Sequence, residues 1–252
     1  MIGKLLRAAF GKAEPPVDRR AEVEALVLRL AGDSPPDRAQ AIERLAEIDR
    51  ESATHHAAIV RALLDFVRRH RTAGSLAPGE PGRDVKAALG ALARRAWVES
   101  EAEPLALGGL DLGGLSISGA DFRRADLSRS LLANCNFLGS KMRGADLGGA
   151  VLDDTLLMAV HLEGANLAGS SLRATNLTDA FLDEATLVGS DLRFTILVKA
   201  SLRNADLTGA AFEGTQLGGA DLTGVRGLTS EQLTGAEVDD LTMLPSELAP
   251  RT

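Results

Sequence analysis

Large apolar residues recur at every fifth position through the second half of the chain. From Leu107 to Leu222 this step gives 24 positions, of which 19 are Leu and the others are Ile117, Phe122, Phe137, Met142 and Phe212. A β-strand alternates its faces every two residues and an α-helix repeats near 3.6 residues, so neither explains the spacing. The pattern therefore indicates a repeat architecture.

A second series, made of small residues, lies two positions before the large ones. Its 21 members from Ala120 to Ala220 are all Ala, Ser, Thr, Cys or Val. A narrow tube needs this alternation, because it has no room for a large side chain at every inward position. Cys135 is followed at 20-residue steps by Thr155, Thr175, Thr195 and Thr215. The small series therefore has a second period of 20 residues.

The tandem motif A(D/N)LxG, seen at Ala145–Gly149 and Ala165–Gly169, resembles the pentapeptide-repeat family. The resemblance implies a mainly β fold, a right-handed, four-sided β-helix solenoid with one pentapeptide on each side. It also implies about 20 residues per coil, which agrees with the threonine spacing. With four pentapeptides per coil, the threonines stack on one side, where their hydroxyls bond to the backbone or to one another. The helical stretch before the repeats is similar, more loosely, to a module found in some bacterial members.

The first 104 residues have helical periodicity instead. Apolar residues at spacings of three and four predict helices around Val23–Leu30, Ala39–Ala46, Ile59–Val67 and Val85–Ala96. Asp84 is expected to cap the last of these, after the loop-like stretch Ala73–Arg83. A further stripe, Ile2–Phe10, is interleaved with basic residues. We expect it to pack against protein or to act as a dimerisation arm, with an anionic membrane surface as the less favoured alternative.

The chain therefore divides into a helical domain (1–104), a pentapeptide-repeat β-helix (105–225) and a C-terminal cap and tail (226–252). Thr229 and Gln232 have the spacing of a capping box, which predicts a short helix after the repeat. This helix and the N-terminal helices are expected to seal the two ends of the tube, because an open end exposes unpaired strand groups.

Candidate chemistry is sparse. Cys135 is the single cysteine, and its place in the small series predicts a buried, inert thiol. The four histidines, His55, His56, His70 and His161, show no metal-ligand spacing. We therefore expect no enzyme activity, no cofactor and no metal. Because no continuous apolar run is long enough for a secretory signal or a bilayer span, a cytoplasmic location is expected.

One side of the predicted rod is apolar where solvent-facing residues should be polar. Five of the ten outward positions on this side, the apolar face, are large and apolar, namely Leu138, Leu156, Met158, Ile196 and Val198. Soluble monomers rarely expose a contiguous patch of this kind. Three explanations stay open: the N-terminal helices fold back over it, it forms a symmetric dimer, or it binds another protein.

A different side is acidic, with Asp126, Asp146 and Asp206 in one row, the acidic face. The net charge of the chain is −7, and residues 105–225 contribute −5 of it (9 basic and 14 acidic side chains). Direct nucleic-acid binding is therefore not expected. The leading hypothesis is a non-catalytic interaction or scaffold module with a protein partner or a second copy. The alternatives are a peripheral membrane adaptor and, from the family resemblance, a DNA mimic that binds or protects DNA gyrase.

Overall fold

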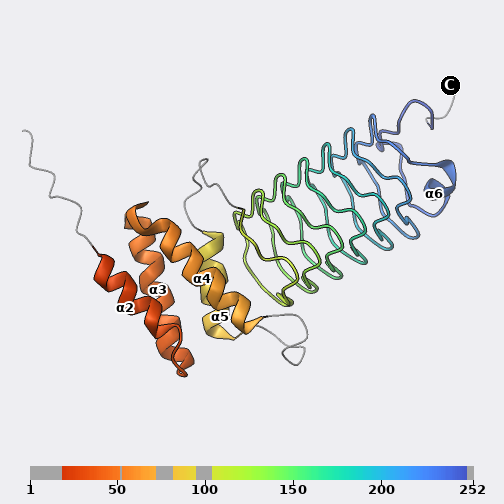
Figure 1. Cartoon of the computed structure of the whole chain (residues 1–252). Coiled ribbons are helices and arrows are strands. Elements are labelled where there is room, and N and C mark those ends of the chain that lie inside the picture. The colour runs from red at the N-terminus through yellow and green to blue at the C-terminus, as the bar shows by residue number, and fades with distance from the viewer. Residues whose placement is uncertain (1–18, 52, 72–81, 95–103, 249–252) are drawn as a thin grey trace, which may run out of the picture.

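The structure, a computed structural model, describes residues 19–51, 53–71, 82–94 and 104–248. Helices gather at one end, and a coil of regularly stacked turns extends away from them to the C-terminus (Figure 1). The predicted stripe Ile2–Phe10 and the loop-like stretch up to residue 81 lie outside the described residues.

Four α-helices and one 3-10 turn make up the described part of the helical end. They are α2 (Arg20–Arg29), α3 (Pro35–Glu51), η1 (Ala53–His55), α4 (His56–His70) and α5 (Arg83–Ala93). The predicted apolar stripes face inward, since Leu26, Ile42, Leu45, Leu63 and Leu89 are all buried. Burial of such side chains stabilises each by about 1.5–3 kcal/mol, which holds the short helices together. The four helices therefore confirm the periodicity of this region.

Asp84 does not cap α5, contrary to the sequence prediction. The N-cap residue is Gly82, and Asp84 is the second residue of the helix. Its side chain is almost fully buried and pairs with Arg38 of α3, with an Nη2–Oδ2 distance of 2.7 Å. A carboxylate in the first turn still favours the helix dipole, but here its main partner is a guanidinium distant in sequence.

Parallel β-bridges join residues that are 20 apart, which confirms one coil for four pentapeptides. The register runs without a break from Ala106↔Asp126 to Asp206↔Arg226, advancing five residues per side. Each side contributes an isolated bridge and not a longer strand. The Leu series and the small series both point into the coil and are buried throughout. The repeat region is therefore a solenoid with a leucine-lined interior.

A turn closes each pentapeptide. From Ala125 to Ala220, the N–H of each small residue donates to the carbonyl of the large apolar residue three positions earlier, as in Ala165 to Leu162 at 2.9 Å. The second central residue has positive φ at all 24 turns from Gly109 to Gly224, and the first does not, which defines a type II turn. Eleven of these 24 residues are not glycine. This turn geometry explains the glycine that the motif places at its last position.

The helices abut the first coil of the solenoid and do not cover its sides. The backbone N–H of Asp111 donates to the carbonyl of Arg71 at 2.9 Å, and that of Asp121 donates to Ala93 at 2.8 Å. Arg71 also forms an ion pair with Asp111, at 3.1 Å between Nη2 and Oδ1. The ends of α4 and α5 thus take the place that a preceding coil would have next to the first coil (Figure 1). The hypothesis that they fold back over the apolar face is wrong for these helices.

In the first coil, large residues replace the small ones, since the positions of the small series are occupied by Leu105, Leu110 and Leu115. All three are buried, and they belong to one continuous core that includes both the helices and the solenoid. Large side chains are needed here because the inside of the first coil meets helices and not another coil.

The tail continues the coil in a less regular form. Glu237 and Met243 form parallel bridges with Gln216 and Asp221, and α6 (Ser230–Thr234) lies between the regular coil and these bridges. The predicted capping box is confirmed, because Thr229 and Gln232 exchange hydrogen bonds. Gln232 also donates to the carbonyl of Ala210 at 2.8 Å, which ties α6 to the last coil.

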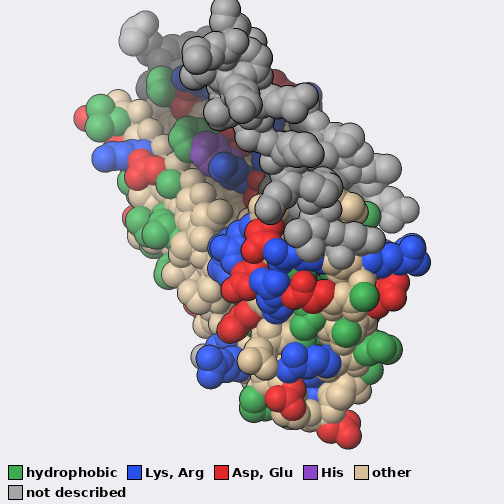
Figure 2. All heavy atoms as spheres, turned by 90° about the vertical axis from the view of Figure 1, so that its left-hand side faces the viewer, with side chains coloured by type: hydrophobic (Ala, Val, Ile, Leu, Met, Phe, Trp, Pro, Cys, Tyr) green, Lys and Arg blue, Asp and Glu red, His purple; other side chains and the backbone are tan. Residues whose placement is uncertain are grey.

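Charged residues of both signs are mixed on the helical end. Figure 2 views the molecule from that end and shows Lys and Arg side chains interspersed with Asp and Glu. Arg44 illustrates the mixture, since it pairs with both Glu22 and Glu47. Surface pairs of this kind contribute little stability but leave no field of one sign.

Candidate interaction face

The five residues predicted for the apolar face lie on one side of the solenoid. On this side each coil contributes one pentapeptide, here called a rung. Parallel bridges join consecutive rungs in the order Asn136, Leu156, Asn176, Ile196 and Gln216. Leu138 and Leu156 are each 44% exposed, and Met158, Ile196 and Val198 are half-buried. Adjacent rungs are about 4.8 Å apart, so side chains from neighbouring coils are in reach of one partner.

A polar rung divides this face into two patches. Thr178 donates from its N–H and its hydroxyl to Oδ1 of Asn176, at 3.0 and 2.7 Å. Leu138, Leu156 and Met158 lie on one side of the polar rung, and Ile196 and Val198 lie on the other. The patches are therefore about two rungs, or roughly 10 Å, apart.

Phe194 extends the second patch, and the sequence prediction missed it. Its ring is 51% exposed although its backbone has φ of +61°, a conformation that costs an L-residue about 1–2 kcal/mol. Gly214 on the next coil leaves room for it, since a Cβ there would lie 2.6 Å from the ring. The guanidinium carbon of Arg173 is 5.9 Å from the ring centroid. The available signal was a Phe at a turn position otherwise filled by Gly, polar residues or Ala.

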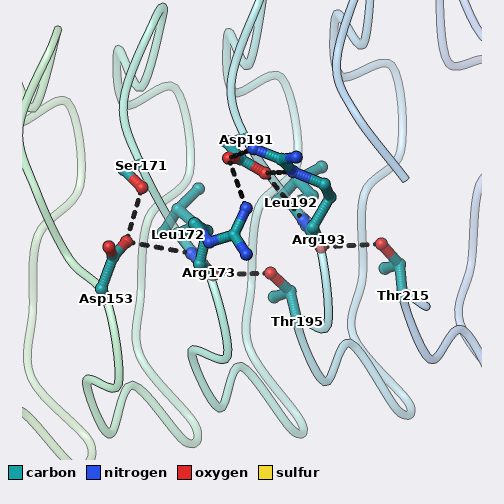
Figure 3. A network of polar contacts seen from close by, with 9 residues as sticks. All are labelled: Asp153, Ser171, Leu172, Arg173, Asp191, Leu192, Arg193, Thr195 and Thr215. Carbon is teal, nitrogen blue, oxygen red and sulfur yellow. Dashed lines mark hydrogen bonds and ion pairs between the residues drawn. The ribbon is translucent and has the colours of Figure 1, made fainter. Parts of the chain in front are cut away.

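The threonine series stacks behind this face, as predicted. Thr155, Thr175, Thr195 and Thr215 are fully buried, and each hydroxyl donates to a backbone carbonyl of the preceding coil at 2.6–2.7 Å. The acceptors are the carbonyls of Leu132, Leu152, Leu172 and Leu192. Figure 3 shows two of these contacts, from Thr195 to Leu172 and from Thr215 to Leu192. The hydroxyls bond to the backbone and not to one another, so each one links two coils.

A chain of charged side chains braces the side next to the apolar face. Asp191 accepts from Nε of Arg193 at 2.8 Å, and Arg173 reaches the same carboxylate from the preceding coil at 3.3 Å (Figure 3). The hydrogen bonds from Arg193 outweigh the cost of partial burial and lower the pKa of Asp191 to about 2. Asp153 accepts from Ser171 and from the backbone of Arg173, which continues the chain of contacts.

The carboxylates of the acidic face are largely occupied by their own turns. Asp126, Asp146 and Asp206 each accept the backbone N–H two residues later, at 2.9–3.1 Å. Asp146 also accepts from Asn166 at 2.8 Å, and Asp206 pairs with Arg226 at 3.4 Å. The same turn contact recurs on other sides, at Asp111, Asp121, Asp191 and Asp221. Asp at this position therefore stabilises the turn. This role accounts for the row of aspartates, and no acidic binding surface is needed to explain it.

The side chains that the sequence offered as candidate chemistry are engaged in local contacts. Cys135 is buried, and burial raises the pKa of its thiol to about 12. His161 stacks on Phe181 with ring centroids 4.7 Å apart, and His70 bonds to the carbonyl of Phe66 in its own helix. Within residues 19–51, 53–71, 82–94 and 104–248, no three His, Cys, Asp or Glu side chains form a group that could hold a metal ion. None of the helices in these ranges is long and apolar enough to span a bilayer.

The sequence of the solenoid matches a described family. The family model for pentapeptide repeats (8 copies) matches residues 120–157, 155–193 and 187–224. The chain belongs to the pentapeptide-repeat family. Pentapeptide repeats are generally a structural or interaction fold, which agrees with the scarcity of candidate chemistry. Among curated proteins, none matches the chain.

Several solved pentapeptide-repeat structures are similar to the solenoid. A protein of the Arabidopsis thaliana thylakoid lumen has 32% identity over 42% of this chain and 66% of its own length, with a TM-score of 0.31. A pentapeptide repeat protein from Nostoc Pcc 7120 has 31% identity over 47% of this chain and 84% of its own, with a TM-score of 0.26. Full-length QnrB1, a plasmid-mediated fluoroquinolone resistance protein, has 17% identity over 52% and 84%, with a TM-score of 0.24. TM-scores this low do not transfer a partner from one protein to another.

Proposed function

We propose that this pentapeptide-repeat protein is a non-catalytic interaction module whose apolar face binds a protein partner. The observation that carries the proposal is a pair of apolar patches that the described helices leave uncovered. One is the patch around Leu156, and the other is the half-buried Ile196 and Val198 with the exposed ring of Phe194. Isolated apolar side chains on a surface need no explanation, but five on one side of a rod, with Phe194 beside them, are typical of a binding surface.

The rigidity of the wall supports this proposal. Each rung is fixed by backbone bonds to both neighbouring coils and, behind the face, by a buried threonine hydroxyl such as that of Thr175. A preformed surface loses little conformational entropy on binding. Phe194 supplies the large, half-exposed side chain around which binding energy often concentrates.

The DNA-mimic alternative receives less support from the residues. A mimic of duplex DNA presents a continuous row of negative charge. Here the row of Asp126 and Asp146 continues through Asn166 and Thr186 to Asp206, which pairs with Arg226. Arg129 and Arg226 lie among them on or beside the same side of the coil. A gyrase supercoiling assay with and without a quinolone tests this alternative, and unchanged inhibition in the presence of the protein would exclude it.

Several finer expectations remain part of the proposal. These are the right-handed sense of the coil, the sealing of its ends by the helices and by the tail, the domain boundaries near residues 104 and 225, and a cytoplasmic location. The membrane-adaptor alternative depends on Ile2–Phe10, which lies outside the described residues.

The test replaces exposed apolar residues by serine on one side at a time. The face variant carries Leu156→Ser, Met158→Ser and Ile196→Ser in the full chain. The control variant carries Leu131→Ser, Val151→Ser and Phe181→Ser, which are also exposed or half-buried but lie on other sides. Proteins that co-purify from the cells that produce the chain are compared by mass spectrometry, and the molar mass of each purified variant is measured by light scattering.

We expect the face variant, but not the control variant, to lose at least one co-purifying protein while both keep a folded solenoid. A change from dimer to monomer in the face variant alone would instead assign the face to a second copy. Retention of every partner and of the oligomeric state by the face variant would refute the proposal.

A further inference from the structure

The part of the solenoid nearest the helices carries positive charge, although the solenoid as a whole is acidic. Residues 121–143 hold five basic and two acidic side chains, whereas residues 144–225 hold four basic and eleven acidic ones. Positive and negative charge are therefore separated along the rod. The positive part can attract an acidic partner that the rest of the rod repels.

Three exposed basic residues lie together in this positive part, and we call them the basic patch: Arg124, Lys141 and Arg143. Lys141 and Arg143 flank the buried Met142 on one side of a coil. On the preceding coil, the backbone N–H of Arg124 donates to the carbonyl of Arg143 at 3.0 Å. The stem of Arg124 extends along the next coil, since a Cβ at Gly144 would lie 3.8 Å from its Cγ. Consecutive coils are about 4.8 Å apart, so one partner can reach all three side chains.

The acidic side chains nearest the basic patch are engaged elsewhere. Asp121 pairs with Arg123, with 2.5 Å between Oδ2 and Nη2. Glu163 lies 3.2 Å from Nδ1 of His161. Among the ion pairs within the part of the chain that the structure describes, none involves a residue of the basic patch. The positive charge of the patch is therefore not neutralised by these residues.

The basic patch adjoins the apolar patch that contains Leu138, around one corner of the coil. The corner is the turn at residues 137–140, closed by a bond of 2.9 Å from the N–H of Ser140 to the carbonyl of Phe137. Leu138 is the first central residue of this turn and is 44% exposed, and Lys141 follows the turn directly. A partner that covers Leu138 can therefore contact the basic patch with a neighbouring part of its surface.

The size of the basic patch favours a protein segment over nucleic acid. The patch spans two coils, or roughly 10 Å with its side chains. On the following coil Glu163 takes the position of Arg143, and Asp146 lies beyond the next turn. A DNA duplex carries one negative charge per about 1.7 Å over its whole length and would meet these carboxylates. A short acidic segment of a protein would not.

We propose that the protein bound by the apolar face also places an acidic segment, with Asp or Glu side chains, on Arg124, Lys141 and Arg143. This inference rests on the proposed function and adds the charge of the partner to it. Opposite charges beside an apolar contact raise the association rate and select among partners.

The test uses Lys141 as a chemical reporter in the full chain. A water-soluble carbodiimide joins a lysine amine to a carboxylate that is in contact with it and adds no spacer atoms. Lysate of the cells that produce the chain is treated with carbodiimide, with and without nuclease, and peptides joined to Lys141 are identified by mass spectrometry. Lys141→Arg keeps the charge but removes the reactive amine.

Two triple variants separate the basic patch from net charge. The patch variant carries Arg124→Gln, Lys141→Gln and Arg143→Gln. The charge control carries Arg61→Gln, Arg69→Gln and Arg129→Gln, which are also exposed and remove the same charge at other places. Arg124 and Arg129 are matched in backbone as well, with φ of 58° and 56°. Urea titrations check that both variants stay folded, and the co-purifying proteins are quantified for each.

We expect carbodiimide to join Lys141 to an Asp or Glu side chain of another protein. The patch variant, but not the charge control, should recover about fivefold less of that protein. Lys141→Arg should keep the protein and lose the cross-link. Equal recovery with the two triple variants, or no cross-link from Lys141 to another protein, would overturn the inference.

The other occupants give different results. Cross-links from Lys141 only to carboxylates of a second copy, such as Asp239 and Asp240, would overturn the inference, and so would loss of the partner on nuclease treatment. The serine variant of the apolar face separates the two proposals. Loss of the protein from that variant alone supports the apolar face and refutes the basic patch, whereas loss from the patch variant alone supports the basic patch and refutes the apolar face.

Discussion

The residue that ends each pentapeptide turn adopts the left-handed backbone region, whatever its side chain. Glycine reaches this region without strain, but Ala174 and ten other non-glycine residues pay for it in the native state. The solenoid tolerates this cost because the bridges on both sides of each turn fix the backbone. A substitution at this turn position can therefore change the free energy of unfolding without changing any packing contact.

Ala174→Gly is expected to raise the free energy of unfolding by about 0.5–1 kcal/mol, because relief of the strain exceeds the added entropy of the unfolded chain. Gly164→Ala is expected to lower it by about 1 kcal/mol, since a Cβ at Gly164 meets nothing within 4 Å and only the backbone suffers. Urea titrations measure both. Ala168→Gly, at a turn position without positive φ, is the control and should destabilise slightly. The same sign at positions 168 and 174 would contradict the explanation.

Cys135 occupies the first place of the threonine series with a weaker donor. Its Sγ donates to the carbonyl of Leu112 at 3.2 Å, in the position where the threonines donate a hydroxyl. Cys135→Thr should therefore be more stable than Cys135→Val, which has nearly the same shape but no donor, by about 1 kcal/mol in urea titrations. Equal stability of these two variants would mean that the hydroxyls contribute no net stabilisation.

The threonine series could be predicted from sequence, but the role of the aspartates could not. The step of 20 residues alone places Thr155 and Thr175 one above the other. Asp126 and Asp146 show the same regularity, yet their charge suggested an acidic surface. Only the geometry of the turn reveals that the N–H two residues later lies within reach of the carboxylate.

On the side of the coil that carries Asp191, ion pairs link one rung to the next. Arg173 and Arg193 come from consecutive coils and meet at Asp191, whose side chain is 23% exposed. The two donors hold the carboxylate in its charged form. Because the pKa of Asp191 is lower in the folded protein than in the unfolded chain, ionised Asp191 stabilises the fold.

The stabilisation is complete above the unfolded pKa of about 3.9 and is lost as the pH falls toward the folded pKa of about 2. Asp191→Asn should therefore lower the free energy of unfolding by about 1–2 kcal/mol at pH 7. The difference between wild type and variant should shrink between pH 4 and pH 2, as followed by urea unfolding at each pH. Asp65→Asn, the same substitution at an exposed position of α4, is the matched control. A difference that is independent of pH would contradict the assignment.

Whole elements were predictable in proportion to how strictly their patterns repeat. The five-residue repeat continues through 24 consecutive positions. A single departure from Leu, such as Phe137 or Met142, therefore does not change the prediction. The start of α5 has no such redundancy. Asp84 had the composition of a cap, but its partner Arg38 is 46 residues away, and a pairing of that kind is not visible in a local pattern.

The molecule as a whole depends on the junction between helices and coil, which sequence periodicity does not describe. Leu105, Leu110 and Leu115 interrupt the small series, and in the structure they fill the first coil where it meets the helices. The carbonyls of Arg71 and Ala93 take the places that a preceding coil would offer to Asp111 and Asp121. One core therefore runs through both parts, and we expect them to unfold together.

Arg71 is the residue on which this coupling can be tested. Its guanidinium is buried, pairs with Asp111 and donates to the backbone carbonyl of Asp111. Arg71→Gln should destabilise the protein by about 2–3 kcal/mol, less than for a fully buried pair because Asp111 keeps some access to water. It should also split the single urea transition into two. In the first, the helices unfold and the helical circular-dichroism signal is lost, and in the second, at higher urea, the coil unfolds. Arg69→Gln, an exposed neighbour whose guanidinium donates to the carbonyl of Asp65 in α4, should unfold like the wild type. A single, merely shifted transition in Arg71→Gln would show that other contacts of the junction hold the two parts together.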